Sequence, residues 1–244
     1  MTKKVIGIVP KANSLFTTDF YNDDIYAFVN NYGKRITEAG GLPIGLVPID
    51  AGENASGIEE QLDMCHALLF SGGGRIWPYH IRAIHYAYKR GIKVLGICMG
   101  MQVMHTYFIL RDEAQRRGLT DASADELLEI YDEMKKARYY FVEPVSHHWD
   151  IDPTASHMQD AKHLVAVKCQ SNTSKVMGLE PFDKINAVTM HRYRVINPSK
   201  DLAVTMMADD DTIEGIEYGD IFIGVQFHPE AETEFMELFK WLCA

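Results

Sequence analysis

The chain has 244 residues, of which 47% are hydrophobic and 24% are charged, which excludes an intrinsically disordered protein and suits one α/β domain. The 34 acidic residues outnumber the 24 lysines and arginines, and the formal net charge of −10 disfavours binding to nucleic acid or to an anionic membrane. The four cysteines are too few for a disulfide scaffold and lack the short paired spacing of a zinc site. No apolar run is long enough for a membrane span. We therefore expect a cytoplasmic, single-domain protein over residues 1–244.

The first hundred residues alternate between short apolar segments and amphipathic segments. Continuous apolar runs predict buried strands at residues 5–9, 42–49, 67–70 and 93–97. Apolar residues at helical spacing predict helices at 25–39, 59–64 and about 79–90, and the polar stretch 13–23 is predicted to be a loop. Because strands and helices alternate, we expect an α/β fold with a doubly wound, mostly parallel sheet and flanking helices.

The second half of the chain begins helical and then becomes strand-like. A long helix is predicted at 99–116, and the capping-box pair Ser123 and Glu126 predicts the start of another. Alternating patterns further on predict strands at residues 164–167, 185–190, 202–206, 213–218 and 221–227. The chain is predicted to close with an amphipathic helix at 232–242. We therefore expect a small antiparallel β element in the C-terminal half.

The sharpest chemical signal is the run Gly96-Ile97-Cys98-Met99-Gly100, which lies between a predicted strand and a predicted helix. A turn this sharp crowds the backbone, so the flanking glycines avoid clashes that a Cβ would cause. The turn would place the Cys98 sulfur at a helix N-terminus, where unpaired N–H groups favour the nucleophilic thiolate. This pattern is a nucleophile elbow with sulfur in place of a hydroxyl. The alternative is that Cys98 is a small buried hydrophobic residue.

A cysteine nucleophile needs a base that also returns a proton to the leaving group, and the base needs a partner that orients it. The last predicted strand ends at His228, where the loops of a parallel sheet present functional groups. Pro229 stiffens the turn, and Glu230 follows within reach of the far ring nitrogen of the histidine. The order Cys98, His228, Glu230 differs from that of α/β-hydrolases, in which the acid normally precedes the histidine.

With these motifs the sequence resembles the class I glutamine amidotransferase superfamily, and within it the stand-alone γ-glutamyl-γ-aminobutyrate hydrolase-like branch. The likeness covers nearly the whole chain and rests on residues 6–8, 32, 39–43, 48, 71–74, 78, 96–102 and 225–230. The resemblance implies the flavodoxin-like fold of that superfamily. It also implies that Cys98 attacks a γ-carboxamide carbonyl, that His228 protonates the departing amine, and that Glu230 holds the imidazole. A γ-glutamyl thioester would form and be hydrolysed by water.

The same resemblance implies residues that bind the transition state and the substrate. The backbone N–H groups of Gly73 and Met99 would form the oxyanion hole. The expected substrate-binding residues are Gln102, Gly72, His191, Arg192 and Tyr193. The triple glycine is not a P-loop, since no Gly-Lys-Ser/Thr follows it. The alternative is that it is only a flexible turn.

The sequence departs from that branch at three places. Arg75 and Ile76 stand where an aspartate is usual. The segment 189–193 lacks the small residue and the glutamine that usually follow its histidine. A capped helical insertion at about 111–136 replaces a Gly-Gly stretch. All three lie where the distal group of the substrate would sit. We therefore expect the insertion to cover the site and set specificity, and a packing or oligomer contact is the alternative.

Two enzyme hypotheses follow. The first is a free-standing hydrolase of the γ-glutamyl amide bond in a small γ-glutamyl amine or amino acid. The second is a glutaminase subunit that delivers ammonia to a separate synthetase, which would then be its protein partner. Neither requires a cofactor, a metal ion, nucleic acid or a membrane, and both allow a homo-oligomer. A non-catalytic binding protein on the same fold conflicts with the intact set of Cys98, His228 and Glu230.

The remaining polar clusters carry no predicted chemistry. We predict solvated side chains for a group of histidines in an irregular segment without ligand spacing, namely His147, His148, His157 and His163. The acidic run 209–211 is predicted to be a turn between strands, because a calcium loop needs ligands at alternate positions. The segment 77–79 either lines the substrate pocket or packs in the core.

Overall fold

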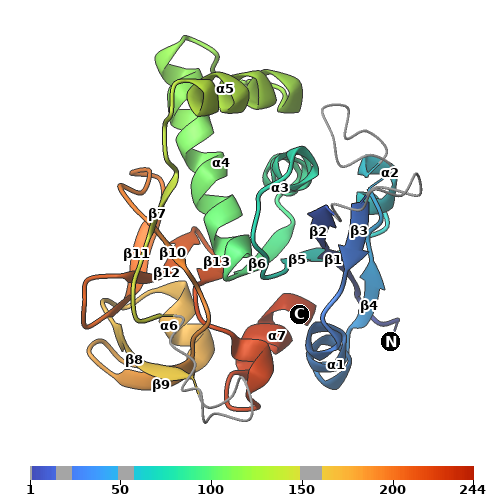
Figure 1. Cartoon of the computed structure of the whole chain (residues 1–244). Coiled ribbons are helices and arrows are strands. Elements are labelled where there is room, and N and C mark those ends of the chain that lie inside the picture. Colours follow the sequence, from blue (N-terminus) through green and yellow to red (C-terminus); the bar gives the residue numbers. More distant parts are fainter. Residues whose placement is uncertain (1, 15–23, 49–57, 149–160) are drawn as a thin grey trace.

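The computed structural model describes residues 2–14, 24–48, 58–148 and 161–244, and within them one large sheet carries helices on both faces (Figure 1). The nine strands follow the order β4-β1-β5-β6-β13-β12-β11-β8-β9. Their bounds are β1 (Val5–Val9), β4 (Leu42–Gly45), β5 (Ala67–Phe70), β6 (Lys93–Ile97), β8 (Lys162–Val167), β9 (Lys184–Val188), β11 (Ala203–Ala208), β12 (Ile213–Tyr218) and β13 (Phe222–Val225).

The strands from β4 to β13 run parallel, and β12, β11, β8 and β9 then continue the sheet antiparallel. This arrangement confirms the predicted α/β fold with a mostly parallel sheet and antiparallel strands in the C-terminal half. The antiparallel strands do not form a separate layer, because β12 pairs directly with β13. The sequence pattern could not predict that β12 pairs with β13, because the alternation of apolar and polar residues within a strand does not specify which strand lies beside it.

Helices from different parts of the chain cover the two faces (Figure 1). One apolar core contains residues of α2 (Glu59–Leu62), α3 (Pro78–Arg90), α4 (Met99–Arg116) and α5 (Ala124–Lys136). The other contains residues of α1 (Asn30–Glu38), α6 (Asn172–Met177) and α7 (Met236–Cys243). This is the doubly wound arrangement expected from the alternation of strands and helices. Among the described segments, no helix combines the length and apolarity that crossing a bilayer requires.

The N-terminal part differs from the sequence prediction. The backbone at 11–14 forms β2 (Lys11–Ser14), which pairs antiparallel with β3 (Asp24–Ala27). Residues 13–14 are therefore strand instead of loop, and the predicted helix at 25–39 is wrong in its first turn. The reason is tertiary: the Tyr26 ring packs edge-on against Tyr79 of α3 at 5.9 Å between centroids. Residues 15–23 of the predicted loop lie outside the described residues.

A second small sheet was also not predicted. It pairs β7 (Val142–Pro144) with β10 (Tyr193–Val195), two segments that are about fifty residues apart in the chain. Such a pairing of short segments leaves no hydrophobic period in the sequence, because each strand is only three residues long. The ladder brings the segment after α5 next to residues 190–193.

The glycines of the Cys98 turn are required by close packing. A Cβ on Gly96 would lie 2.7 Å from the backbone carbonyl of Gly100, and a Cβ on Gly100 would lie 2.3 Å from the carbonyl oxygen of Phe70. Both obstacles are backbone atoms, which cannot move aside as a side chain can. The start of α4 therefore lies directly on β5 and β6, as the sequence analysis expected from the elbow pattern.

We expect Gly100→Ala to destabilise the protein by about 3 kcal/mol, near the upper end of overpacking costs, because backbone must shift to admit the methyl group. Gly33→Ala is the matched control: Gly33 lies in α1, and a methyl group added there would meet only Pro43, at 3.9 Å. That change should stabilise the protein by up to about 1 kcal/mol through helix propensity. Urea unfolding of both variants gives the two free energies, and equal values would contradict the packing argument.

Candidate active site

Three neighbouring parallel strands end at the same edge of the sheet and present the candidate residues. Ser71 and Gly72 follow β5, Cys98 follows β6, and His228 comes three residues after β13. These strands are adjacent in the order β5-β6-β13, and their register pairs Phe70 with Gly96 and Val225 with Ile97. Because hydrogen-bonded strands are about 4.8 Å apart, the residues that follow them meet in one place.

Cys98 occupies a strained backbone conformation. Its φ of 54° and ψ of −108° lie outside the regions that a residue with a side chain normally adopts. Its N–H donates a 2.8 Å hydrogen bond to the carbonyl of Val225, and α4 begins at the next residue. Strain of this kind persists only where the surroundings enforce it, and it is concentrated at functional sites. The geometry is that of a nucleophile elbow, and the Cys98 side chain is buried at its tip.

His228 is oriented by an acidic partner. Its Nδ1 lies 2.7 Å from Oε1 of Glu230, and its backbone N–H donates to the carbonyl of Val188 at 2.8 Å. Glu230 is held in turn, since Nε of the buried Arg35 donates to its carbonyl oxygen at 3.1 Å. Nε2 of His228 is buried and has no hydrogen-bond partner among the described residues, so it can serve an incoming group.

The charges around His228 favour its protonated form. Burial alone lowers the pKa of the imidazole, but the negative charge of Glu230 and the neighbouring Cys98 outweigh burial and raise the pKa well above its usual value. A cysteine hydrolase needs a thiolate as its nucleophile and an imidazolium beside it as the proton donor to the leaving group.

The glycine loop after β5 comes very close to both side chains. A Cβ on Gly72 would lie 3.1 Å from Cε1 of His228 and 3.5 Å from Cβ of Cys98. The Gly72 N–H donates to the hydroxyl of Tyr32 at 3.0 Å, so it is already used. By contrast, neither the N–H of Gly73 nor that of Met99 donates to another described residue. These two N–H groups remain available for a ligand oxygen.

A cavity of about 490 Å³ opens beside these groups. Its walls include Cys98, His228, Glu230 and every residue that the sequence analysis expected to bind substrate: Gly72, Gln102, His191, Arg192 and Tyr193. The same cavity is also lined by three residues that were not predicted as site residues, namely Lys11, Asn31 and Tyr32. Lys11 was detectable, because it comes two residues after β1 at the edge where parallel strands present functional groups.

Two of the expected substrate-binding residues are engaged with protein atoms. The Gln102 amide nitrogen donates to the carbonyl of Tyr193 and to Oε1 of Gln226, both at 3.2 Å, so its own oxygen is the part left for substrate. The ring nitrogens of His191 lie near Glu214 and near the Tyr193 carbonyl. Both residues therefore hold the wall of the cavity in place.

The histidine prediction was wrong for two residues. His148 is 5% exposed and His163 is partly buried, and both face Glu214 of β12 instead of solvent. Tertiary structure gathers them from separate segments, which sequence spacing did not indicate. His147 is exposed, and His157 lies outside the described residues.

The comparison with known families agrees with this geometry. The model of the family described as glutamine amidotransferase class-I matches residues 22–238. The chain belongs to the class I glutamine amidotransferase family. A domain of this family implies amide hydrolase activity, and the predicted superfamily is confirmed. The narrower γ-glutamyl hydrolase branch stays a prediction.

Relatives of this amidotransferase domain include synthetases. A CTP synthase of Nocardia farcinica is 27% identical over 214 residues, which are 77% of this chain and 33% of that protein. The chain thus spans about a third of the length of that relative. The glutaminase domain of the Trypanosoma brucei CTP synthase, solved with bound acivicin, has a TM-score of 0.63 at 19% identity over 98% of this chain and 91% of that one. A Thermotoga maritima glutamine amidotransferase has a TM-score of 0.56 at 15% identity over 94% and 77%.

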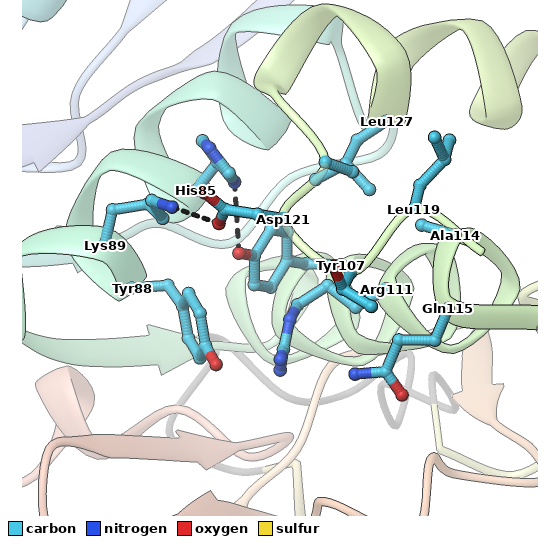
Figure 2. Close-up of a pocket in the computed structure, with 12 residues that line it drawn as sticks. His85, Tyr88, Lys89, Tyr107, Arg111, Ala114, Gln115, Leu119, Asp121 and Leu127 are labelled. Atoms are coloured by element: carbon cyan, nitrogen blue, oxygen red, sulfur yellow. Dashed lines mark hydrogen bonds and ion pairs between the residues drawn. The ribbon is translucent and has the colours of Figure 1, made fainter.

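The helical insertion of this amidotransferase is firmly attached. Leu127 and Ile130 of α5 are buried in the core shared with α3 and α4. The ion pairs Arg82–Asp125 and Lys89–Asp121 join the insertion to α3. Figure 2 shows the second of these pairs beside a small cavity under the link between α4 and α5. That cavity holds only about 100 Å³, which is too small for a substrate.

The insertion nevertheless reaches the candidate active site. A second cavity of about 380 Å³ shares the lining residues Gly74, Gln102 and Tyr193 with the first and therefore adjoins it. Tyr131 and Lys135 of α5 line this second cavity, together with an aromatic segment at 139–141. The insertion thus contributes a wall at the distal end of the site, consistent with the expected role in specificity.

Proposed function

We propose that this amidotransferase domain is a cysteine hydrolase that cleaves the γ-glutamyl amide bond of a small γ-glutamyl amine or amino acid. The observation that carries the proposal is the strained Cys98 beside the buried, unpartnered Nε2 of His228, with Glu230 on the other ring nitrogen. This is the nucleophile, base and orienting acid of covalent amide hydrolysis.

The reaction proceeds in two halves. The Cys98 thiolate attacks the γ-carbonyl carbon, and the tetrahedral intermediate collapses as Nε2 of His228 gives its proton to the departing amine. The resulting γ-glutamyl thioester is attacked by water, whose proton passes to His228, and glutamate leaves as the Cys98 sulfur is released. The N–H groups of Gly73 and Met99, which donate to no other described residue, would stabilise the oxyanion, and such a donor contributes about 3 kcal/mol to lowering the barrier.

The charges and shape of the cavities support this substrate class. Lys11 and Arg192 line the first cavity and suit the α-carboxylate of a glutamyl group. The adjoining second cavity offers room for a leaving amine larger than ammonia. Its aromatic wall favours a leaving group with an apolar portion, since aromatic surfaces contribute most through burial of apolar area.

The alternative function is a glutaminase domain that delivers ammonia to a synthetase. The similarity to CTP synthases favours this alternative. The chain matches about a third of the length of the Nocardia farcinica CTP synthase. A dedicated glutaminase has to suppress wasteful turnover until its synthetase docks, so it would show little activity alone. The walls built by α5 and by residues 190–193 argue against this alternative. They occupy the rim of the site, where a synthetase would have to dock to receive the ammonia.

We expect the isolated protein to hydrolyse at least one γ-glutamyl amine with a turnover on the order of 1 per second or more, and glutamine more slowly. The leaving group of glutamine is ammonia, which makes no contact with the second cavity, so this cavity does not favour glutamine as a substrate. Steady-state assays against glutamine and a panel of γ-glutamyl amines and amino acids measure this. A preference for glutamine, or activity only with an added synthetase, would support the alternative.

The same panel tests the wall itself. Tyr140 lines the second cavity and is 70% exposed, so Tyr140→Ala should leave the fold intact while reducing selectivity for the preferred amine over glutamine. Phe182→Ala is the matched control, since Phe182 is a similarly exposed aromatic residue that lines neither cavity. Unchanged selectivity in Tyr140→Ala would show that the second cavity does not receive the leaving group.

A further inference from the structure

A compact cluster of three histidines and one glutamate lies behind the wall of the active site. His148 follows β7, His163 is on β8, His191 lies between β9 and β10, and Glu214 is on β12. One nitrogen or oxygen of each lies within 4.8 Å of those of the others. His148 and His191 are nearly inaccessible, the Glu214 side chain is completely buried, and His163 is 17% exposed.

Three of the distances within the cluster are close to those between the ligands of one small metal ion, and the four donor atoms all lie within 4.8 Å of one another. Nδ1 of His148 lies 3.0 Å from Nε2 of His191, which lies 3.2 Å from Oε1 of Glu214. Nε2 of His163 lies 3.4 Å from Oε2 of the same carboxylate. Ligands bound tetrahedrally to zinc at its usual distance of about 2.0–2.1 Å are separated by about 3.3 Å.

The outer hydrogen bonds determine which ring nitrogens face inward as lone pairs. Nδ1 of His191 lies 3.0 Å from the carbonyl oxygen of Tyr193, which can only accept, so this nitrogen carries the hydrogen. Nε2 of His148 lies 3.0 Å from Oδ2 of Asp210 and donates to it in the same way. The lone pairs on the other two nitrogens then point at each other, which is repulsive unless a cation or a shared proton lies between them. A carbonyl or a carboxylate behind the ring is the usual support of a metal-bound histidine.

Two further buried atoms of the cluster, Nε2 of His163 and Oε2 of Glu214, face each other at 3.4 Å and make no hydrogen bond of good geometry among the described residues. A buried polar atom without a partner is costly, so its presence calls for a ligand. We infer that His148, His163, His191 and Glu214 bind one divalent transition-metal ion of the zinc class. Three imidazoles, one carboxylate and no sulfur suit zinc, and the charge of such an ion is balanced by Glu214 and Asp210.

The site is structural because all four positions of a tetrahedral ion are filled by protein. It would join β8, β12 and the segment at 190–193 that lines the cavity. Through the Tyr193 carbonyl, which also accepts from Gln102, the ion would hold the active-site wall in place. The inference departs from the sequence-based expectation that the protein needs no metal, and it does not depend on which amide is hydrolysed.

The test is metal content and metal-dependent stability of the full chain. After saturation with Zn²⁺ and desalting, mass spectrometry should find about one zinc per wild-type chain. His163→Ala removes the most accessible ligand and should lower zinc affinity at least about 100-fold, while circular dichroism shows a folded protein. EDTA should lower the melting temperature of the wild type and leave that of His163→Ala unchanged. With Co²⁺ in place of zinc, the intense visible bands of tetrahedral coordination are expected.

His147→Asn is the matched control, since His147 is an exposed neighbour with a φ of 66°, a conformation that asparagine accepts. It should bind zinc like the wild type. Glu214→Gln provides a second ligand variant, although its buried position makes it the one more prone to misfold. A wild-type chain that holds less than about 0.1 zinc after saturation, or a His163→Ala variant that holds as much as the wild type, would overturn the inference in favour of a cluster that shares protons.

Discussion

Replacing Cys98 with alanine is expected to lower kcat for amide hydrolysis by about 10⁴-fold or more, because the covalent route is lost when the nucleophile is removed. The fold should remain, since the change deletes one sulfur atom and keeps the Cβ that packs near Gly72. Steady-state assays and a melting curve measure the two effects. A variant that keeps more than about one per cent of wild-type activity would exclude the thioester mechanism.

Cys65→Ala is the control for that substitution. Cys65 is also buried, but burial raises the pKa of its thiol to about 11, so it stays protonated at neutral pH. Iodoacetamide or 6-diazo-5-oxo-norleucine should accordingly modify Cys98 faster than Cys65, Cys169 or Cys243, and peptide mapping reads this out. Equal labelling of all four would contradict the special setting assigned to Cys98.

Replacing Glu230 with glutamine is expected to reduce kcat by about 10³-fold to 10⁴-fold and to change the pH profile. The negative charge of Glu230 is one cause of the raised pKa of His228, so removing it lowers that pKa. The imidazolium is the form that gives a proton to the leaving amine. The alkaline limb of kcat/KM, where this proton is lost, should therefore move to lower pH.

Glu237→Gln on the exposed surface of α7 is the matched control and should leave both the rate and the profile unchanged. A full pH profile of kcat/KM for wild type and both variants is the measurement. If the alkaline limb of Glu230→Gln stayed in place, Glu230 would orient the imidazole without stabilising its charge. If it moved to higher pH, the electrostatic account of the site would be wrong.

Local patterns were sufficient to predict the central part of the fold. The bounds of β1, β5, β6, α4 and β12 coincide with those predicted, because each is an apolar run, an alternating segment or a long helix between clear turn residues. The predictions were wrong or absent where a distant segment decides the structure, as in the β2–β3 hairpin and the β7–β10 ladder. A three-residue strand has no periodicity to detect.

The candidate site shows the same division. Cys98, His228 and the glycine loop could be located from the sequence because each lies within three residues of the end of a parallel strand, where position in the chain predicts position in space. The histidine cluster could not be located, since its four members are spread from residue 148 to residue 214 and share no spacing. Whether a histidine is solvated or buried depends on which strands lie beside it, and the order β12-β11-β8 is a property of the folded sheet.

The separation between the strand ends and the outer wall has a consequence for how this protein can evolve. The groups assigned to bond cleavage follow β5, β6 and β13, where a substitution such as Gly100→Ala meets backbone atoms and destabilises the fold. The wall that would contact the leaving group comes from α5, residues 139–141 and residues 190–193, and it includes exposed side chains such as Tyr140 and Tyr193. Mutations of such exposed side chains cost little stability. New amines can therefore be accepted by neutral drift of the wall while the amide chemistry is inherited unchanged.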